Sequence, residues 1–513
     1  METRTLAALL LLPAALSAVD GQKLFRDRCA ACHGRDARGT GQGPGLAGNP
    51  RLSGQSVDQV RDVVQRGVPS AGMPAFDLPP EELDALAGYV RSLNAGVTVA
   101  PEAGRRVTWG KPEPGDWLTY NGKLTANRYS DLKQIHRGNV GGLRLKWIFP
   151  IPDYGLETTP LEAGGVMYVT GPNQVFAIDA LTGNQIWKYS RPQTRGLEGD
   201  ASLGTNRGVA IREDKVFYET DNAHLLALRR ATGELVWEKT MPEEPQHYGG
   251  TMAPLVVGDT VIAGVAGADQ GIRGFIACYK ADTGELLWRH WTVPRKGEPG
   301  SETWQGSEPL RGPVLVDAAF RGKPRKLLLH ADRNGFFYVL DRTNGELLLT
   351  TPFLRRVDWA AEIAPDGRPR VTAPKGCPDD AANWSSAAFS PATRLFYFLA
   401  LEECTGSPLG YPDQTGQRFL RALAIETGKI VWEAPQPGAA KAKTWSGVLA
   451  TAGGVVFYGK PNGGFEAVDE RDGKMLWRFE TNVRMKASPM TFEVAGKQYV
   501  AVAAGPNILC FGL

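Results

Sequence analysis

The sequence predicts a chain of mixed class, with a small all-α domain followed by a large all-β propeller. Three observations carry this prediction: a Cys-Ala-Ala-Cys-His stretch at 29–33 near two helical segments, a turn-and-strand phrase that recurs through the rest of the chain, and 61 glycines among 513 residues. Glycine spread through a long chain favours many short strands joined by turns. The length alone suggests two or more domains.

Residues 1–18 have the pattern of a secretory signal peptide. Arg4 precedes an apolar core at 6–16, and small residues follow it. The apolar run is too short to span a membrane as a mature helix, and no other run is long enough. We therefore expect export to the periplasm and no transmembrane span in the mature chain, with an uncleaved anchor as the alternative. The net charge of +3 and the absence of a basic block make nucleic acid an unsuitable partner.

Two cysteines separated by two residues and followed at once by histidine form the attachment pattern of a c-type haem. Cys29 and Cys32 can each form a thioether to a haem vinyl group, and His33 then lies under the iron as an axial ligand. A bare CxxC is also compatible with a redox dithiol or half a zinc site, but the histidine and the lack of a second CxxC argue against both. The motif therefore predicts haem c.

The second axial ligand follows by elimination. Between His33 and the region near residue 97 there is no other histidine, and Met73 is the one methionine; a core methionine is the alternative. A thioether ligand raises the haem potential relative to two histidines, which suits an electron acceptor. With helices expected over 20–28 and from residue 79, residues 19–95 resemble a small class I cytochrome c. Residues 96–114, rich in Gly, Pro and Ala, read as a tether.

One phrase recurs after the tether: an apolar strand, a turn through Asp or Thr and then Gly, and a second strand that ends in Trp. Asp and Thr side chains bond turn amides, glycine takes a positive φ at little cost, and a repeated indole can cover the next sheet. Another strand pair precedes most copies, and the spacing of roughly 45–60 residues is typical of propeller blades. We therefore predict a β-propeller over residues 115–513. Its seven recognisable copies end at Trp147, Trp187, Trp237, Trp288, Leu349, Trp432 and Trp477.

This phrase resembles the tryptophan-docking motif of the quinoprotein alcohol dehydrogenases, which use pyrroloquinoline quinone (PQQ). Members that also carry haem c are called quinohaemoproteins, and the family propeller has eight blades. The resemblance implies a cofactor on the propeller axis, held by residues from several blades. Further family-like stretches lie at 115–122, 127–132, 206–210, 332–342 and 496–502.

Six positions match family residues near PQQ. Because PQQ has three carboxylates and an ortho-quinone, arginines are suitable partners, and the resemblance implies that Arg333 polarises a quinone oxygen. Without the resemblance, each arginine would be read as part of a surface ion pair, Glu157 as a strand-end charge and Trp384 as a core aromatic. The six positions are Glu157, Arg207, Thr251, Arg333, Asn383 and Trp384.

By the same resemblance, Asp269 falls where the family places a carboxylate ligand to calcium. A hard cation prefers oxygen donors and would act beside the quinone as a Lewis acid. The family commonly has Glu at this position, and a turn aspartate beside glycine is the alternative.

The remaining cysteines divide into two kinds. Cys377 and Cys404 could form a disulfide in an oxidising compartment. Cys278 and Cys510 lie in apolar strands and read as buried thiols.

The family match fails between Trp288 and the unit that ends at Leu349. Relatives have about one further blade here, which supplies an aromatic floor under PQQ, an asparagine ligand to calcium and the aspartate proposed as catalytic base. None of the three is found in this chain, whose sequence passes almost directly from Trp304 to Glu308, so the catalytic base stays unknown. The adjacent cysteine pair common in the family is also absent, with alanine and serine at 201–202.

We therefore expect a periplasmic dehydrogenase that oxidises an alcohol, polyol or sugar with PQQ. It would pass electrons to its haem c and then to a soluble or membrane acceptor, such as another cytochrome. The alternative is a haem c electron-transfer protein with a non-enzymatic propeller scaffold, which the missing base, asparagine and aromatic floor motivate.

Overall fold

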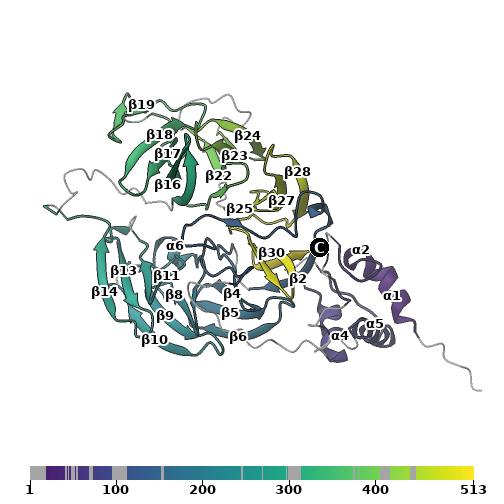
Figure 1. Cartoon of the computed structure of the whole chain (residues 1–513). Helices are drawn as coiled ribbons and strands as arrows, with labels where there is room; N and C mark the ends of the chain where they lie inside the picture. Colours follow the sequence, from purple (N-terminus) through teal and green to yellow (C-terminus); the bar gives the residue numbers. More distant parts are fainter. Residues whose placement is uncertain are drawn as a thin grey trace, which may run out of the picture. The chain divides into compact units, whose positions relative to one another are not determined.

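The computed structural model in Figure 1 falls into two compact units, residues 1–98 and 99–513, and each is described by itself. The proposed signal peptide and most of the tether lie outside the described residues. In the described part of the chain, no helix has the length and apolar character needed to cross a membrane. The structure describes residues 19–40, 43, 45–47, 52, 56–68, 73–94, 113–151, 155–243, 247–267, 270–295, 297–298, 313–373, 376–378, 380–404, 416–438 and 446–513.

The N-terminal unit is helical. Asp20 begins the helix at Gly21–Arg28 by accepting hydrogen bonds from the backbone N–H groups of Gln22 and Lys23, and Ser56 begins the helix at Val57–Arg66 with a capping box. A Cβ atom at Gly21 would overlap the carbonyl of Ala85, so glycine allows the first and last helices to cross closely. The helices are α1 (Gly21–Arg28), α2 (Ala30–His33), α4 (Val57–Arg66) and α5 (Pro80–Ser92). Their apolar core contains Phe25, Val60, Val64, Leu83, Leu86 and Val90.

The described residues of the C-terminal unit form seven antiparallel sheets with four main strands each. They are numbered here in chain order, and the last sheet also takes up β2 from the start of the unit. Sheet 1 has β3 (Leu161–Ala163), β4 (Val166–Gly171), β5 (Gln174–Asp179) and β6 (Gln185–Ser190). Sheet 2 has β7 (Ala210–Arg212), β8 (Lys215–Glu219), β9 (His224–Arg229) and β10 (Leu235–Thr240). Sheet 3 has β11 (Leu255–Val257), β12 (Thr260–Gly264), β13 (Phe275–Lys280) and β14 (Leu286–Trp291).

The other four sheets repeat this pattern. Sheet 4 has β15 (Val314–Phe320), β16 (Lys323–Ala331), β17 (Phe336–Asp341) and β18 (Glu346–Pro352). Sheet 5 has β21 (Ala388–Ser390), β22 (Leu395–Glu402), β23 (Gln417–Ala424) and β24 (Ile430–Gln436). Sheet 6 has β25 (Val448–Thr451), β26 (Val455–Gly459), β27 (Gly464–Asp469) and β28 (Met475–Glu480). Sheet 7 has β29 (Met490–Val494), β30 (Lys497–Ala504), β31 (Asn507–Gly512) and β2 (Arg144–Pro150).

Sheet 7 joins the two ends of this unit, because β2 pairs antiparallel with β31. A short strand, β1 (Tyr129–Ser130), adds to sheet 6 in parallel with β25, and β19 (Ala360–Ile363) and β20 (Pro369–Val371) form a separate hairpin. The prediction of a helical domain followed by a β-propeller is confirmed.

The strand order decides where loops from different sheets can meet. In an antiparallel four-stranded sheet, the connection between the second and third strands leaves at the same end as the connection to the next sheet. Arg333 lies on a connection of the first kind, between β16 and β17, whereas Arg207 lies on one of the second kind, between β6 and β7. Residues distant in the chain therefore gather at one end of the sheets.

Four of the recurring tryptophans lock one sheet to the next. In each lock the indole Nε1–H donates to a backbone carbonyl in the next sheet's turn, and the ring lies against the turn glycine. Trp187 donates to the carbonyl oxygen of Arg230 at 2.8 Å, and a Cβ atom at Gly233 would lie 2.6 Å from its ring. The other locks join Trp147 to Ala180 and Gly183, Trp237 to Ala281 and Gly284, and Trp432 to Glu470 and Gly473, with donor–acceptor distances of 3.1, 3.0 and 3.0 Å.

The passage from sheet 3 to sheet 4 lacks such a lock among the described residues. So do the passages from sheet 4 to sheet 5, where the phrase ends in Leu349, and from sheet 6 to sheet 7, where Trp477 packs against Phe511 without such a hydrogen bond. Trp288 is 44 % exposed, and a Cβ atom at Gly345, the matching glycine of sheet 4, would meet no heavy atom within 4 Å. Residues 299–312 lie between these sheets and outside the described residues, so the Trp304–Glu308 junction is not described. Of the three passages without a lock, this one coincides with the stretch where the sequence departs from the family.

Candidate active site

The predicted haem residues lie where α1 passes into α2. The backbone N–H of His33 donates to the carbonyl of Cys29 at 2.9 Å, so Cys29 and His33 are separated by one helical turn. His33 is buried, neither Cys29 nor Cys32 belongs to a disulfide, and burial raises the pKa of the Cys29 thiol to about 11. Neither sulfur is therefore committed to a disulfide.

Met73, the predicted second iron ligand, is held by its backbone. It exchanges two hydrogen bonds with Val68, at 2.9 and 3.2 Å, so both ends of the loop between them are tied together. Partly buried apolar side chains pack against the helical core near these segments and offer the apolar surroundings that a haem requires. They include Leu46, Leu52, Phe76 and Leu78.

In the propeller, Arg207 brings together three of the predicted PQQ residues. Its Nη2 lies 3.0 Å from Oε2 of Glu157, and its Nη1 donates to Oγ1 of Thr251 at 2.9 Å. Its guanidinium carbon lies 4.3 Å from the ring centroid of Trp384, a cation–π contact. These residues come from the loops that lead into sheets 1, 2, 3 and 5, so a single side chain joins four sheets.

A second group joins the remaining predicted residues. Nε of Arg333 donates to Oδ1 of Asp380 at 3.0 Å, and Nδ2 of Asn383 donates to the other carboxylate oxygen at 3.0 Å. Asp380 is 4 % exposed. Because Asn383 precedes Trp384 directly, the two groups are contiguous, and all six predicted positions form one site.

Charge at this site is concentrated and partly unsatisfied. Burial raises the pKa of Glu157, although Arg207 and Lys486 act in the opposite direction, and Nζ of Lys486 lies 3.6 Å from Oε1 of Glu157. In the described structure, the buried Nε of Arg207 and Oγ1 of Thr159 have no hydrogen-bond partner. Such orphaned buried atoms call for a ligand or water. The cations, the unmet donor and the indole of Trp384 fit a planar polyanion such as PQQ.

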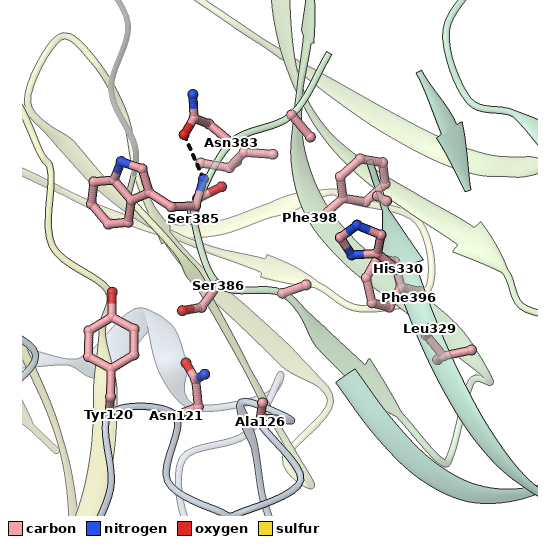
Figure 2. Close-up of a pocket in the computed structure, with 15 residues that line it drawn as sticks. Tyr120, Asn121, Ala126, Leu329, His330, Asn383, Ser385, Ser386, Phe396 and Phe398 are labelled. Carbon is pink, nitrogen blue, oxygen red and sulfur yellow. Dashed lines mark hydrogen bonds between the residues drawn. The ribbon is translucent and has the colours of Figure 1, made fainter. Parts of the chain in front are cut away.

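The site continues into a cavity of about 210 Å³ (Figure 2). Asn383 and Trp384 border it, and the hydroxyl of Tyr120, which also lines it, is buried without a hydrogen-bond partner in the described structure. Apolar side chains from β16 and β22 form much of the remaining wall. They are Leu329, Ala331, Phe396, Phe398 and Leu399.

A disulfide between Cys377 and Cys404 anchors the loop that carries Asp380, Asn383 and Trp384, with a Cα–Cα separation of 5.2 Å. Cys404 lies two residues beyond the end of β22, so the loop is tied to sheet 5 near the cavity.

The two other cysteines of the propeller lie in strands, as expected. Cys278 in β13 and Cys510 in β31 are buried, and burial raises the pKa of Cys510 well above its ordinary value.

The predicted calcium site is not part of the structure that is described. Asp269 lies outside the described residues, and in the described ranges no group of three or more His, Cys, Asp and Glu side chains could hold a metal ion. Calcium ligation by Asp269 therefore stays a prediction.

Sequence reasoning missed residues that the fold brings to the site. Asp380 and Lys486 lie in loops without a motif, and only spatial proximity identifies them. Glu219, at the end of β8, is fully buried, and burial raises its pKa well above the ordinary value while nearby Arg207 lowers it.

Comparison with known proteins assigns both units. The family model of the glucose/ethanol/alcohol dehydrogenase β-propeller domain matches residues 117–312 and 434–500, and that of cytochrome c oxidase cbb3-type subunit III matches residues 17–90. A quinohemoprotein alcohol dehydrogenase of Pseudomonas putida, ADH IIB, is 32 % identical over 82 % of this chain and 77 % of its own. That alignment spans 546 positions, more than the 513 residues here, so the relative contains stretches that this chain lacks.

Solved structures agree. The quinohemoprotein alcohol dehydrogenase of Comamonas testosteroni has a TM-score of 0.68 at 26 % identity, covering 89 % of this chain and 84 % of its own. The structure of ADHIIG from Pseudomonas putida also has a TM-score of 0.68 at 26 % identity, covering 78 % of this chain and 80 % of its own. The two domains, their order in one chain and these relatives lead to one assignment. The chain belongs to the PQQ-dependent quinohaemoprotein alcohol dehydrogenases, a family of enzymes.

Proposed function

We propose that this protein oxidises a small alcohol, polyol or sugar in the periplasm and delivers the electrons through its own haem c to an external acceptor. The observation that carries the proposal is the convergence of Glu157, Thr251 and Trp384 on Arg207. This arrangement places a cation, hydrogen-bonding groups and a flat aromatic surface in one place. The proposed signal peptide at 1–18 supports export, which haem c attachment also requires.

Each residue of the site has a role that its contacts support. Arg207 and Lys486 would neutralise carboxylates of PQQ, and Trp384 would stack on its plane. Arg333, held by Asp380, would face a quinone oxygen and stabilise negative charge there. When bound, PQQ supplies an ortho-quinone that takes up two electrons from the substrate. Asp269 would contribute a carboxylate to a calcium ion beside it.

In the N-terminal unit, Cys29 and Cys32 would hold the haem covalently, with His33 and Met73 on its two faces. A cytochrome is a suitable external acceptor, because a relative that is 28 % identical is the 1-butanol dehydrogenase (cytochrome c) of Thauera butanivorans.

The direct test is haem reduction. Purified haem-loaded protein is incubated with PQQ and calcium, and the haem absorbance is followed after addition of primary alcohols, polyols or sugars. We expect reduction that requires PQQ, and quenching of tryptophan fluorescence as PQQ binds near Trp384. Arg207→Ala should weaken PQQ binding at least tenfold, whereas the exposed His290→Ala should not.

If the propeller is a non-enzymatic scaffold, PQQ is expected to have no effect in either measurement. If PQQ neither quenches fluorescence nor supports haem reduction by any donor, the propeller does not act as a dehydrogenase. A reversible haem wave in the same sample would then identify a cytochrome with a silent scaffold.

A further inference from the structure

The catalytic aspartate expected from the family is not found in this sequence, but the cavity beside the proposed quinone site contains a different base. His330, near the end of β16, lines the same cavity as Asn383 and Trp384. Figure 2 shows its ring on the side formed by β16 and β22, with Ser386 and Tyr120 on the other side. It is the one histidine among the residues that line this cavity.

A carboxylate fixes the orientation of this ring. Nε2 of His330 lies 2.9 Å from Oδ2 of Asp332, and Oδ1 of Asp332 accepts the backbone N–H of Asn334 at 3.0 Å. Asp332 therefore cannot turn without losing a turn hydrogen bond. When Nε2–H donates to Asp332, Nδ1 carries the lone pair. Among the described residues, no hydrogen bond uses this Nδ1.

The neighbours of His330 supply the other needs of alcohol oxidation. Arg333 lies three residues further along, on the connection that follows β16, and its Nε donates to Asp380 at 3.0 Å. Leu329, Phe396 and Phe398 give the cavity apolar walls that suit a carbon chain. A base, apolar walls and two of the proposed quinone-binding residues, Asn383 and Trp384, thus border one space. The titratable groups beside the ring are Asp332 and Tyr338, whose ring centroid lies 6.5 Å away.

We propose that His330 is the catalytic base of this protein and that Asp332 is its positioning residue. The substrate hydroxyl gives its proton to Nδ1 of His330, and bound PQQ would supply the two-electron acceptor that takes the carbinol hydrogen as a hydride. The C–O bond becomes a carbonyl, two electrons leave with the hydride, and the imidazolium beside Asp332 later returns the proton to solvent. This inference rests on the proposed function and assigns its missing proton acceptor.

The first test is substitution with chemical rescue in the PQQ-loaded, haem-containing protein. His330→Ala should lower kcat by about 10² to 10⁴ with KM changed less than about fivefold, because a positioned base acts on the reacting proton. Added imidazole should restore part of the activity of His330→Ala and leave the wild type and the surface variant His290→Ala unchanged. His330→Gln, closer in size, controls for folding, and PQQ binding by both variants should match the wild type.

The second test does not depend on turnover. Diethyl pyrocarbonate modifies accessible histidines, and mass spectrometry locates each modified residue. PQQ should slow modification of His330 but not of His290, because His330 shares its cavity with Asn383 and Trp384. Asp332→Asn should lower kcat by at least tenfold and remain insensitive to imidazole, as expected for a positioning residue.

The outcomes separate the two levels of the proposal. A wild type that reduces haem while His330→Ala keeps its kcat overturns the base assignment and leaves the proposed function standing. Loss of activity without imidazole rescue, together with unprotected His330, also overturns it in favour of a structural role. A wild type that reduces no haem with any donor overturns both.

Discussion

The recurring turn-and-strand phrase packs in two different ways in this propeller. At the passage from sheet 1 to sheet 2, Trp187 is 8 % exposed and lies on Gly233, to whose turn it donates a hydrogen bond. At the passage from sheet 3 to sheet 4, Trp288 is 44 % exposed, and Gly345 faces open space. The tryptophan and the glycine of a lock are both present in the second case, but the two residues are not in contact.

The difference shows that a lock is a property of two neighbouring sheets and not of one phrase. The apolar core agrees, because the described clusters join sheets 1, 2, 6 and 7, sheets 2 and 3, sheets 4 and 5, and sheets 5 and 6, whereas none of them spans sheets 3 and 4. A repeat can therefore keep its docking residues after its docking partner has been lost.

The largest expected effect comes from removing an indole on each side of the comparison. Trp187→Ala should destabilise the propeller by about 3–5 kcal/mol, since it deletes a buried aromatic ring and leaves a cavity. Trp288→Ala should cost about 1 kcal/mol or less, because the ring is half exposed. Urea unfolding followed by far-UV circular dichroism measures both. Equal losses would mean that Trp288 is docked in solution, and the contrast between the two passages would fail.

A smaller difference should appear at the glycines. Both Gly233 and Gly345 have positive φ, at 76° and 78°, so alanine is strained by a similar amount at each position. Only at Gly233 would the new methyl group also collide with an indole, at 2.6 Å. We expect Gly233→Ala to be the more damaging by about 1–3 kcal/mol, the usual cost of overpacking. The matched backbone angles make Gly345→Ala the internal control in thermal unfolding.

The locked passage from sheet 2 to sheet 3 also buries a carboxyl group, which gives it a pH dependence. A Cβ atom at Gly250, on the loop into sheet 3, would lie 2.6 Å from Cγ of Glu219. Burial raises the pKa of Glu219 in the folded state, so the folded protein holds a proton that the unfolded chain releases above about pH 4.5. Stability should therefore fall as pH rises from the unfolded pKa towards the folded one. Glu219→Gln should flatten this fall in urea titrations at several pH values, and an unchanged slope would contradict the assignment.

The sequence predicted those features that depend on residues close together in the chain. The haem motif and the docking phrase are both short, so spacing alone predicted the attachment residues and the seven strand–turn–strand units. The PQQ positions came from a family resemblance, because Arg207 and Trp384 meet only when the sheets are placed around a common axis. Asp380 and His330 had no motif at all, and only the loop and strand packing shows that they border the site.

The smallest expected effect is a change in how much of the tryptophan fluorescence a quencher in solution can reach. Acrylamide quenches tryptophan fluorescence in proportion to exposure, and Trp288 has a large accessible ring while Trp147 is 2 % exposed. Trp288→Phe should therefore remove a disproportionate share of the quenchable fluorescence, whereas Trp147→Phe should remove signal that acrylamide hardly reaches. Trp147 also donates to the carbonyl of Ala180, a bond that phenylalanine cannot make, so its replacement should lower the melting temperature as well. If Trp288→Phe leaves the quenchable fraction unchanged, the indole is covered in solution, and the passage between sheets 3 and 4 is closed by a contact like those of the four tryptophan locks.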